Sequence, residues 1–159
     1  MAAFEIEVPA LMRAPKVVDA LGRVEAGADR ILDEAVRICQ IPAPTFDEGE
    51  RAAYVRARYE ALGLKDVAID GAGNVRGRRP GAGGGTSVAV VTHMDTVFPR
   101  GTDLTVKRQE GRLAAPGLGD NSLSIASVLG IIEALDAAGV TTAGDLYFAA
   151  TTGEEGLGD

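Results

Sequence analysis

The sequence has little of the residue types that most often build disulfide and metal sites. It contains one histidine, one cysteine and no tryptophan among 159 residues, and 4% of its residues are aromatic. With Cys39 as the only cysteine, no disulfide can form within the chain, and a zinc site made of cysteines is excluded. A reducing cytoplasm is the simplest location for such a chain, so we expect a cytoplasmic protein.

Positive charge is also scarce. The chain has 16 Lys and Arg against 23 Asp and Glu, with a formal net charge of −7, and its basic residues are scattered. This balance argues against a nucleic-acid partner. Glu5 and Glu7 stand where a secretory signal would be positively charged, and no stretch approaches the ~20 apolar residues of a membrane span. We therefore expect no nucleic-acid and no membrane partner, and one domain or part of a larger one.

The apolar periodicity predicts helices and short strands. Residues 1–14 show no clear period and are expected to form a loose lead-in, whereas apolar residues from Val17 to Ile38 recur at helical spacing. Thr45 and Glu48 offer a capping box for a second helix. The other expected elements are a hairpin (67–70 and 74–77), an uncharged strand buried on both faces (87–92), a small hairpin (104–109 and 112–114), a helix (125–135, closed by Gly139) and a second uncharged strand (146–150).

The lone histidine, His93, stands two residues before Asp95, where the first uncharged strand ends. An imidazole that binds zinc usually donates its other ring N–H to a carboxylate, and the His-x-Asp spacing could supply that carboxylate locally. A single histidine is more often an ordinary surface or hydrogen-bonded group. Taken alone, this pair leaves both interpretations open.

Two further acidic clusters are expected at the same edge of the sheet. Glu154 and Glu155 follow the strand at 146–150, and Asp120 precedes the helix that connects the two strands. The carboxyl ends of strands in an open α/β sheet face a common crevice, where these groups could supply ligands to a metal. Asp120 alone would be an ordinary helix N-cap, and the two glutamates alone could be a solvated turn. The prediction of a metal site depends on the whole set.

These motifs resemble a known family. The order His93-Met94-Asp95, then Gly117-Leu118-Gly119-Asp120-Asn121, then Glu154-Glu155-Gly156 is similar to the co-catalytic di-zinc metallopeptidases and deacylases, which include glutamate carboxypeptidase, peptidase T, acetylornithine deacetylase and succinyl-diaminopimelate desuccinylase. The resemblance runs from about Ile41 to Asp159. It implies an α/β fold with a mixed, mostly parallel sheet flanked by helices, as in zinc exopeptidases, in which residues 15–159 form the N-terminal part of the catalytic domain.

The resemblance also implies a role for each site residue. His93 would bind one of two divalent metal ions, most simply Zn²⁺, with Co²⁺ or Mn²⁺ as alternatives. Asp95 would orient His93, Asp120 would bridge the two metals, and Glu155 would bind the second. Glu154 would be the general base. The implied substrate is a peptide or an N-acyl amino acid, whose amide bond is hydrolysed.

In that family the catalytic domain continues after the Glu-Glu-Gly segment. The continuation carries a further acidic ligand, a lid or dimerisation domain through which relatives often form homodimers, and a distal histidine. Since His93 is the only histidine here, we expect an incomplete catalytic domain. As an isolated chain it would bind zinc weakly and hydrolyse amides poorly or not at all. It would also expose apolar sheet surface and unpaired strand edges, and would tend to aggregate.

Two other functions fit parts of the sequence. The chain could be a non-catalytic remnant that binds a partner through its exposed surface. Glycines at 81 and 83–85 could also suggest a nucleotide-binding α/β domain. However, the glycine segment lacks the G-K-[ST] ending of a phosphate-binding loop, and no helix directly follows it, which favours a flexible loop.

Overall fold

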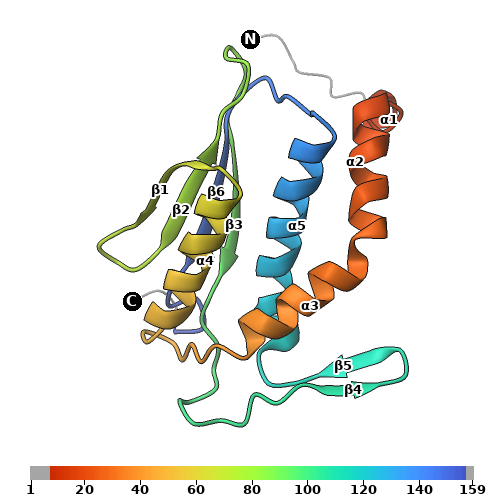
Figure 1. The fold of residues 1–159 in the computed structure, drawn as a ribbon. Coiled ribbons are helices and arrows are strands. Elements are labelled where there is room, and N and C mark those ends of the chain that lie inside the picture. The colour runs from red at the N-terminus through yellow and green to blue at the C-terminus, as the bar shows by residue number, and fades with distance from the viewer. Residues whose placement is uncertain (1–7, 157–159) are drawn as a thin grey trace.

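The structure is a computed structural model that describes residues 8–156, and it places helices beside a four-stranded sheet (Figure 1). The expected lead-in over residues 1–14 lies partly outside the described residues, and the rest of it contains a short helix, α1. The elements in chain order are α1 (Val8–Leu11), α2 (Pro15–Ala26), α3 (Ala28–Cys39), α4 (Gly49–Ala61), β1 (Lys65–Ile69), β2 (Val75–Arg79), β3 (Val88–His93), β4 (Lys107–Gln109), β5 (Arg112–Ala114), η1 (Leu118–Ser122), α5 (Leu123–Ala137) and β6 (Leu146–Thr151).

The main sheet is mixed, as predicted, with the strand order β1-β2-β6-β3. Strands β3 and β6 are parallel, whereas β1–β2 and β2–β6 are antiparallel. The α/β fold is therefore confirmed, but the expectation of a mostly parallel sheet is wrong for the described strands. The physical reason is the β1–β2 hairpin, because its second strand joins β6 directly and runs opposite to it. The predicted small hairpin is present as β4–β5.

The first predicted helix is in fact two helices that meet at Gly27. The Gly27 N–H donates to the carbonyls of Arg23 and Val24, which ends α2 before α3 begins. A Cβ atom at Gly27 would lie 3.0 Å from the Arg23 carbonyl oxygen, so glycine suits this tight turn. Helix α3 turns away from α2 in Figure 1, and both helices pack against α5. The helical spacing of apolar residues continues across Gly27 because α2 and α3 each bury an apolar face against α5.

The predicted capping box at Thr45 and Glu48 is also wrong. Helix α4 begins at Gly49, and Glu48 occupies the N-cap position without capping the helix through its side chain. Its carboxylate accepts hydrogen bonds from the Phe46 and Gly153 N–H groups instead. The end of the helix is as predicted, since Gly63 follows it with a φ of +74°.

Helix α5 forms the centre of the core. Its buried residues include Ile125, Leu129 and Ile132, and Gly139 follows the helix with a φ of +61°, as predicted. Leu118–Ala137 is long and apolar enough to cross a membrane by length and composition, contrary to the expectation from the sequence. More than half of this stretch is buried inside the domain, which is the position of a core helix.

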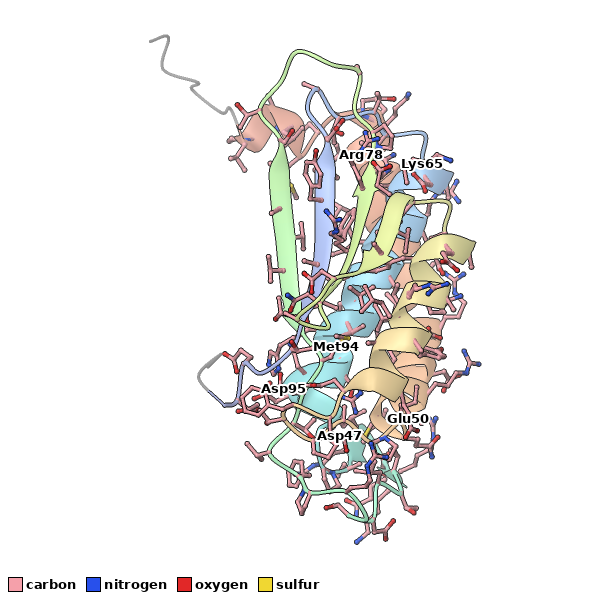
Figure 2. The ribbon with its side chains drawn as sticks, turned by 90° about the vertical axis from the view of Figure 1, so that its left-hand side faces the viewer. Asp47, Glu50, Lys65, Arg78, Met94 and Asp95 are labelled. Carbon is pink, nitrogen blue, oxygen red and sulfur yellow. The ribbon has the colours of Figure 1, made fainter. Side chains whose placement is uncertain are left out.

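The sheet is covered by helices on one face only. Val75, Phe148 and Ala150 point into the core, whereas Val91 and Tyr147 on the other face are 61% and 45% exposed. Strand β3 pairs only with β6 among residues 8–156. Figure 2 shows the strands in front of α5 on this open side. The prediction that the first uncharged strand is buried on both faces is therefore wrong, and the expected exposed apolar sheet surface is confirmed.

The two valines give a direct test of this one-sided packing. We expect Val75→Ala to lower the free energy of unfolding by about 2 kcal/mol, because the lost methyl groups are fully buried. Val91→Ala should change it by less than about 0.5 kcal/mol, since this side chain is already in solvent. Urea unfolding followed by circular dichroism measures both. Equal losses in the two variants would contradict the assignment of the covered face.

Tyr59 on α4 gives a second test, at alkaline pH. Its hydroxyl is buried without a hydrogen-bond partner among the described residues, and burial raises the pKa of Tyr59. The folded state therefore keeps a proton that the unfolded chain releases above pH about 10, so stability is lost as the pH rises further. We expect Tyr59→Phe to remove the part of this alkaline loss of stability that comes from the buried hydroxyl. At pH 7 it should be neutral or stabilising by about 1 kcal/mol.

Urea midpoints at pH 7 and pH 10.5 measure this effect. Tyr147→Phe, on the open face of the sheet, is the matched control and should leave the difference between the two midpoints unchanged. If Tyr59→Phe had the same pH dependence as the parent chain, the buried hydroxyl would not be the group responsible.

Candidate metal centre

The predicted site residues gather at one edge of the sheet, where β3 and β6 end. His93 is the last residue of β3 and lies opposite Thr151, the last residue of β6. The turn that carries Glu154 and Glu155 follows β6, and Asp95 follows β3 (Figure 2). The sequence-based expectation that these groups share an edge is therefore confirmed.

The His93 ring lies between carboxylates on both of its nitrogen atoms. Nε2 is 3.0 Å from Asp120 Oδ1 and 3.9 Å from Glu154 Oε2. Nδ1 is 3.3 Å from Asp95 Oδ1, which is within ion-pair distance, although the orientation does not make a hydrogen bond. The predicted pairing of His93 with Asp95 is thus present as a close contact. With Nδ1 on the Asp95 side, Nε2 of His93 faces Asp120 and Glu154.

Asp95 also holds the turn after β6. Its side chain is completely buried, and it accepts hydrogen bonds from the Glu154 N–H at 3.1 Å and the Glu155 N–H at 2.9 Å. Both contacts join residues that are about sixty positions apart in the sequence. Asp95 therefore connects the two loops that carry the site, which is more than the orienting role implied by the resemblance.

Asp120 is not a helix N-cap. It lies inside η1 with an extended backbone (φ −120°, ψ 99°), in a cis peptide with Asn121, and Ser122 rather than Asp120 precedes α5. Its carboxylate contacts His93 instead. Asn121 fixes this segment to β3, because its side-chain amide donates to Thr92 Oγ1 at 2.8 Å and to the His93 carbonyl at 3.3 Å.

The donor set fits divalent cations. Ligand atoms of His93, Glu154 and Glu155 all lie within 4.8 Å of one another, and Asp120 Oδ1 lies 3.0 Å from Nε2 of His93. Adjacent ligand atoms on a tetrahedral zinc ion are about 3.3 Å apart, close to the observed contact between His93 and Asp120. Among residues 8–156, His93 is the only basic side chain within salt-bridge distance of these carboxylates.

The glycines beside Glu154 and Glu155 allow a close approach of the loop before α4. A Cβ atom on Gly153 would lie 2.8 Å from the Phe46 ring, and one on Gly156 would lie 2.8 Å from both Phe46 and Thr45. Gly153 also has a φ of +71°. The loop before α4 therefore packs directly on the turn that carries the two glutamates.

Arg51 is a supporting residue that the sequence reasoning did not identify. Its guanidinium is 1% exposed and donates to the Met94 carbonyl at 2.6 Å and to the Ile41 carbonyl at 2.7 Å. Burial lowers the pKa of Arg51 to about 10, while Cys39 and Asp95 oppose that shift. One signal was present in the sequence: Arg51 precedes Val55 and Tyr59 at four-residue steps, so it occupies a core position of α4.

Asn74, in the turn between β1 and β2, also supports the site. Its side-chain oxygen accepts the Thr152 N–H at 3.0 Å, and its own N–H donates to Asp70. The β1–β2 turn is thereby attached to the segment just before Gly153.

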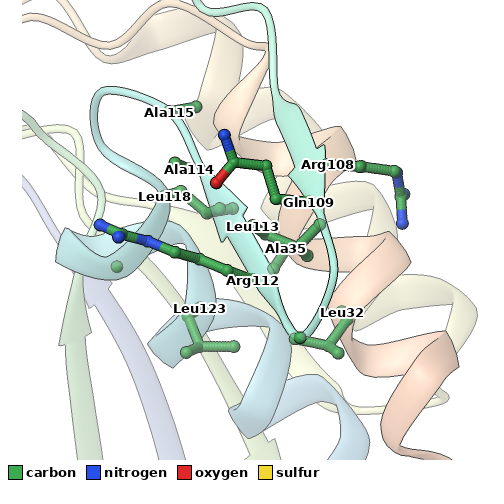
Figure 3. Close-up of a pocket in the computed structure, with 12 residues that line it drawn as sticks. Leu32, Ala35, Arg108, Gln109, Arg112, Leu113, Ala114, Ala115, Leu118 and Leu123 are labelled. Atoms are coloured by element: carbon green, nitrogen blue, oxygen red, sulfur yellow. The ribbon is translucent and has the colours of Figure 1, made fainter.

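A large cavity lies beside the carboxylate cluster rather than within it. It has a volume of about 920 Å³ and lies between the β4–β5 hairpin, α3 and the start of α5 (Figure 3). Leu32, Leu113, Leu118 and Leu123 give it apolar walls. His93, Asp95, Asp120, Glu154 and Glu155 do not line it. We therefore place the candidate site at the sheet edge, on the chemistry of its side chains.

We expect Arg51→Met to lower the free energy of unfolding by about 2–4 kcal/mol. Removing the buried cation relieves its desolvation, but it leaves two buried carbonyl groups without their donors, and this loss is the larger effect. Arg56→Met on the same helix is the control. Its exposed pairing with Glu60 should contribute no more than about 0.5 kcal/mol. Urea unfolding distinguishes the two, and equal stabilities would contradict the supporting role.

Comparison with known proteins agrees with this geometry. The signature of "Peptidase family M20/M25/M40" matches residues 89–159. No curated protein matches the chain at a significant level. Among solved structures, aminopeptidase PepT from Bacillus cereus is 27% identical with a TM-score of 0.70, over 80% of this chain and 37% of that one.

Two more distant structures share the fold. Dipeptidase Dug1p from Saccharomyces cerevisiae is 15% identical with a TM-score of 0.74, over 89% of this chain and 36% of that one. YxeP from Bacillus subtilis, described as a dinuclear metal-binding peptidase, is 16% identical with a TM-score of 0.60, over 82% of this chain and 37% of that one. This chain therefore spans little more than a third of the length of each of the three proteins. The sequence signature over residues 89–159 and the fold are therefore similar to those of peptidase family M20/M25/M40.

Proposed function

We propose that the chain carries part of the metal centre of a hydrolase that cleaves peptide or N-acyl amide bonds. The observation that carries this proposal is the gathering of carboxylates at the His93 ring. Asp120 and Glu154 face Nε2, a Glu155 oxygen lies within 4.8 Å of a ring nitrogen, and Asp95 faces Nδ1. So many carboxylates repel one another unless cations lie between them. The similarity to peptidase family M20/M25/M40 supports the same function.

In this proposal, His93 and Glu155 each hold one of two divalent ions, and Asp120 is shared between them. Zn²⁺ is the most suitable ion because the donors are one imidazole nitrogen and several carboxylate oxygens, with Co²⁺ or Mn²⁺ as substitutes. When bound, the ions would polarise the scissile carbonyl and lower the pKa of the attacking water. The description of YxeP as a dinuclear metal-binding peptidase supports the number of ions.

Glu154 is proposed as the general base. Its side chain is 60% exposed and its carboxylate lies on the His93 Nε2 side of the ring, so it can reach both a water molecule and a bound substrate. Glu154 would take a proton from the water whose oxygen attacks the carbonyl carbon. It would then deliver that proton to the amine nitrogen as the carbon–nitrogen bond breaks. Asp95 would hold the His93 ring and the Glu154 backbone in place throughout.

We propose a small peptide as the substrate class and the cytoplasm as the location. PepT and Dug1p are described as an aminopeptidase and a dipeptidase, which favours peptides over N-acyl amino acids. The free, buried thiol of Cys39 fits a reducing compartment.

Glutamine substitutions separate the proposed roles of the two neighbouring glutamates. Glu154→Gln should leave metal binding within about threefold of the parent and lower metal-dependent amide hydrolysis by about 10²–10⁴-fold, because a proton acceptor is lost. Glu155→Gln and His93→Ala should each weaken metal binding by at least about tenfold, since a ligand is lost. Co²⁺ titration followed by visible absorbance measures binding, and mass spectrometry of di- and tripeptide mixtures measures hydrolysis.

Glu110→Gln, in the turn of the β4–β5 hairpin, is the control and should change neither quantity. If Glu154→Gln weakened Co²⁺ binding and Glu155→Gln did not, the two roles would have to be exchanged. Failure of the parent chain to bind Co²⁺, Zn²⁺ or Mn²⁺ would overturn the proposed metal centre.

A further inference from the structure

Glu48 is a buried acidic residue that the proposed reaction does not use. It is 5% exposed, and no basic side chain among residues 8–156 lies within salt-bridge distance of it. Both of its hydrogen bonds come from backbone groups, the Phe46 N–H at 2.9 Å and the Gly153 N–H at 3.0 Å, and both reach the same oxygen, Oε1. A buried carboxylate with only these partners is costly, so it indicates a specific task.

The Gly153 contact completes a row of three anchored N–H groups. Glu48 holds the N–H of Gly153, and Asp95 holds those of Glu154 and Glu155. The backbone of the turn is therefore attached to two buried carboxylates on its inner side. This attachment leaves the two glutamate side chains on the side of His93, where they approach its ring.

The two anchors come from different parts of the chain. Asp95 follows β3, whereas Glu48 precedes α4 and is 105 positions away from Gly153 in the sequence. The same loop carries Phe46, whose ring packs on Gly153 and Gly156. The Phe46 N–H donates the second hydrogen bond that Glu48 accepts. Loop and turn thus form one packed unit, and Glu48 is the hydrogen-bonding group at its centre.

We propose that Glu48 is a positioning residue that sets the orientation of Glu154 and Glu155 towards the metal centre. This inference rests on the proposed function. Glu48 acts through the length of its side chain, which we call its reach. Its Oε1 must extend to the Gly153 N–H, and the negative charge as such is not required. Substituting outer groups that orient metal ligands commonly weakens metal affinity by about 10–100-fold.

Three substitutions separate reach from charge. Glu48→Gln keeps a carbonyl oxygen at the same distance, so Co²⁺ affinity should stay within about threefold of the parent. Glu48→Asp keeps the charge but is one methylene shorter, and Glu48→Ala removes the group. Both should weaken Co²⁺ binding by about tenfold or more and alter the visible spectrum of the bound ion.

A second measurement does not need the metal. Hydrogen exchange of the Gly153, Glu154 and Glu155 amides, followed by NMR on the metal-free chain, should be at least about tenfold faster in Glu48→Asp and Glu48→Ala, and close to the parent in Glu48→Gln. Asp145→Ala is the matched control. Asp145 accepts a glycine N–H from Gly81 at the opposite end of the sheet, and its loss should leave both readouts unchanged.

The results distinguish the two proposals. Loss of Co²⁺ binding and amide protection in Glu48→Gln, with retention in Glu48→Asp, would overturn positioning by reach, as would parent-like behaviour of Glu48→Ala. If Glu48→Ala does not fold, the Asp and Gln variants decide the question. If the parent chain binds no Co²⁺, the proposed metal centre fails, while amide exchange still tests whether Glu48 holds the turn.

Discussion

The buried carboxylate of Asp95 is the interaction on which the candidate site depends. A fully desolvated carboxylate must find hydrogen-bond donors, and two of those available to it are the backbone N–H groups of Glu154 and Glu155. The same group faces the His93 ring. Satisfying one buried charge therefore fixes the histidine and both glutamates relative to one another. The carboxylates of Asp120, Glu154 and Glu155 can then lie together at this edge of the sheet.

The surrounding fold supports this arrangement from three directions. Parallel pairing of β3 with β6 aligns His93 with Thr151, so the two strands end at the same level. Helix α4 contributes Arg51, which holds the Met94 carbonyl beside Asp95. Asn121 ties η1 to β3 and thereby brings Asp120 to the ring. Helices α4 and α5 contact the sheet, and α2 and α3 pack on α5, whereas Val91 and Tyr147 on the other face of the sheet are exposed.

Local patterns predicted much of the fold, and they failed where a distant group competed with a local one. The β1–β2 and β4–β5 hairpins and the end of α5 follow from turn residues and periodicity, which act within a few residues. The capping box failed because Glu48 bonds to Gly153, on the other side of the site. The N-cap interpretation of Asp120 failed for the same reason, since its carboxylate contacts His93 instead. In each case the tertiary contact replaced the local hydrogen bond.

The sequence by itself determined which residues are candidates for the site and which family their motifs resemble. His93, Asp95, Glu154 and Glu155 stand out by type and by their positions after uncharged strands, and Asp120 stands out by its position before the helix between those strands. Only the tertiary structure decided how they are held. The hydrogen bonds that Arg51 donates, those that Asp95 accepts and the one that Glu48 accepts from Gly153 join residues between 10 and 105 positions apart. Most of these pairings leave no periodic signal in the sequence, because their partners are backbone groups that every residue possesses.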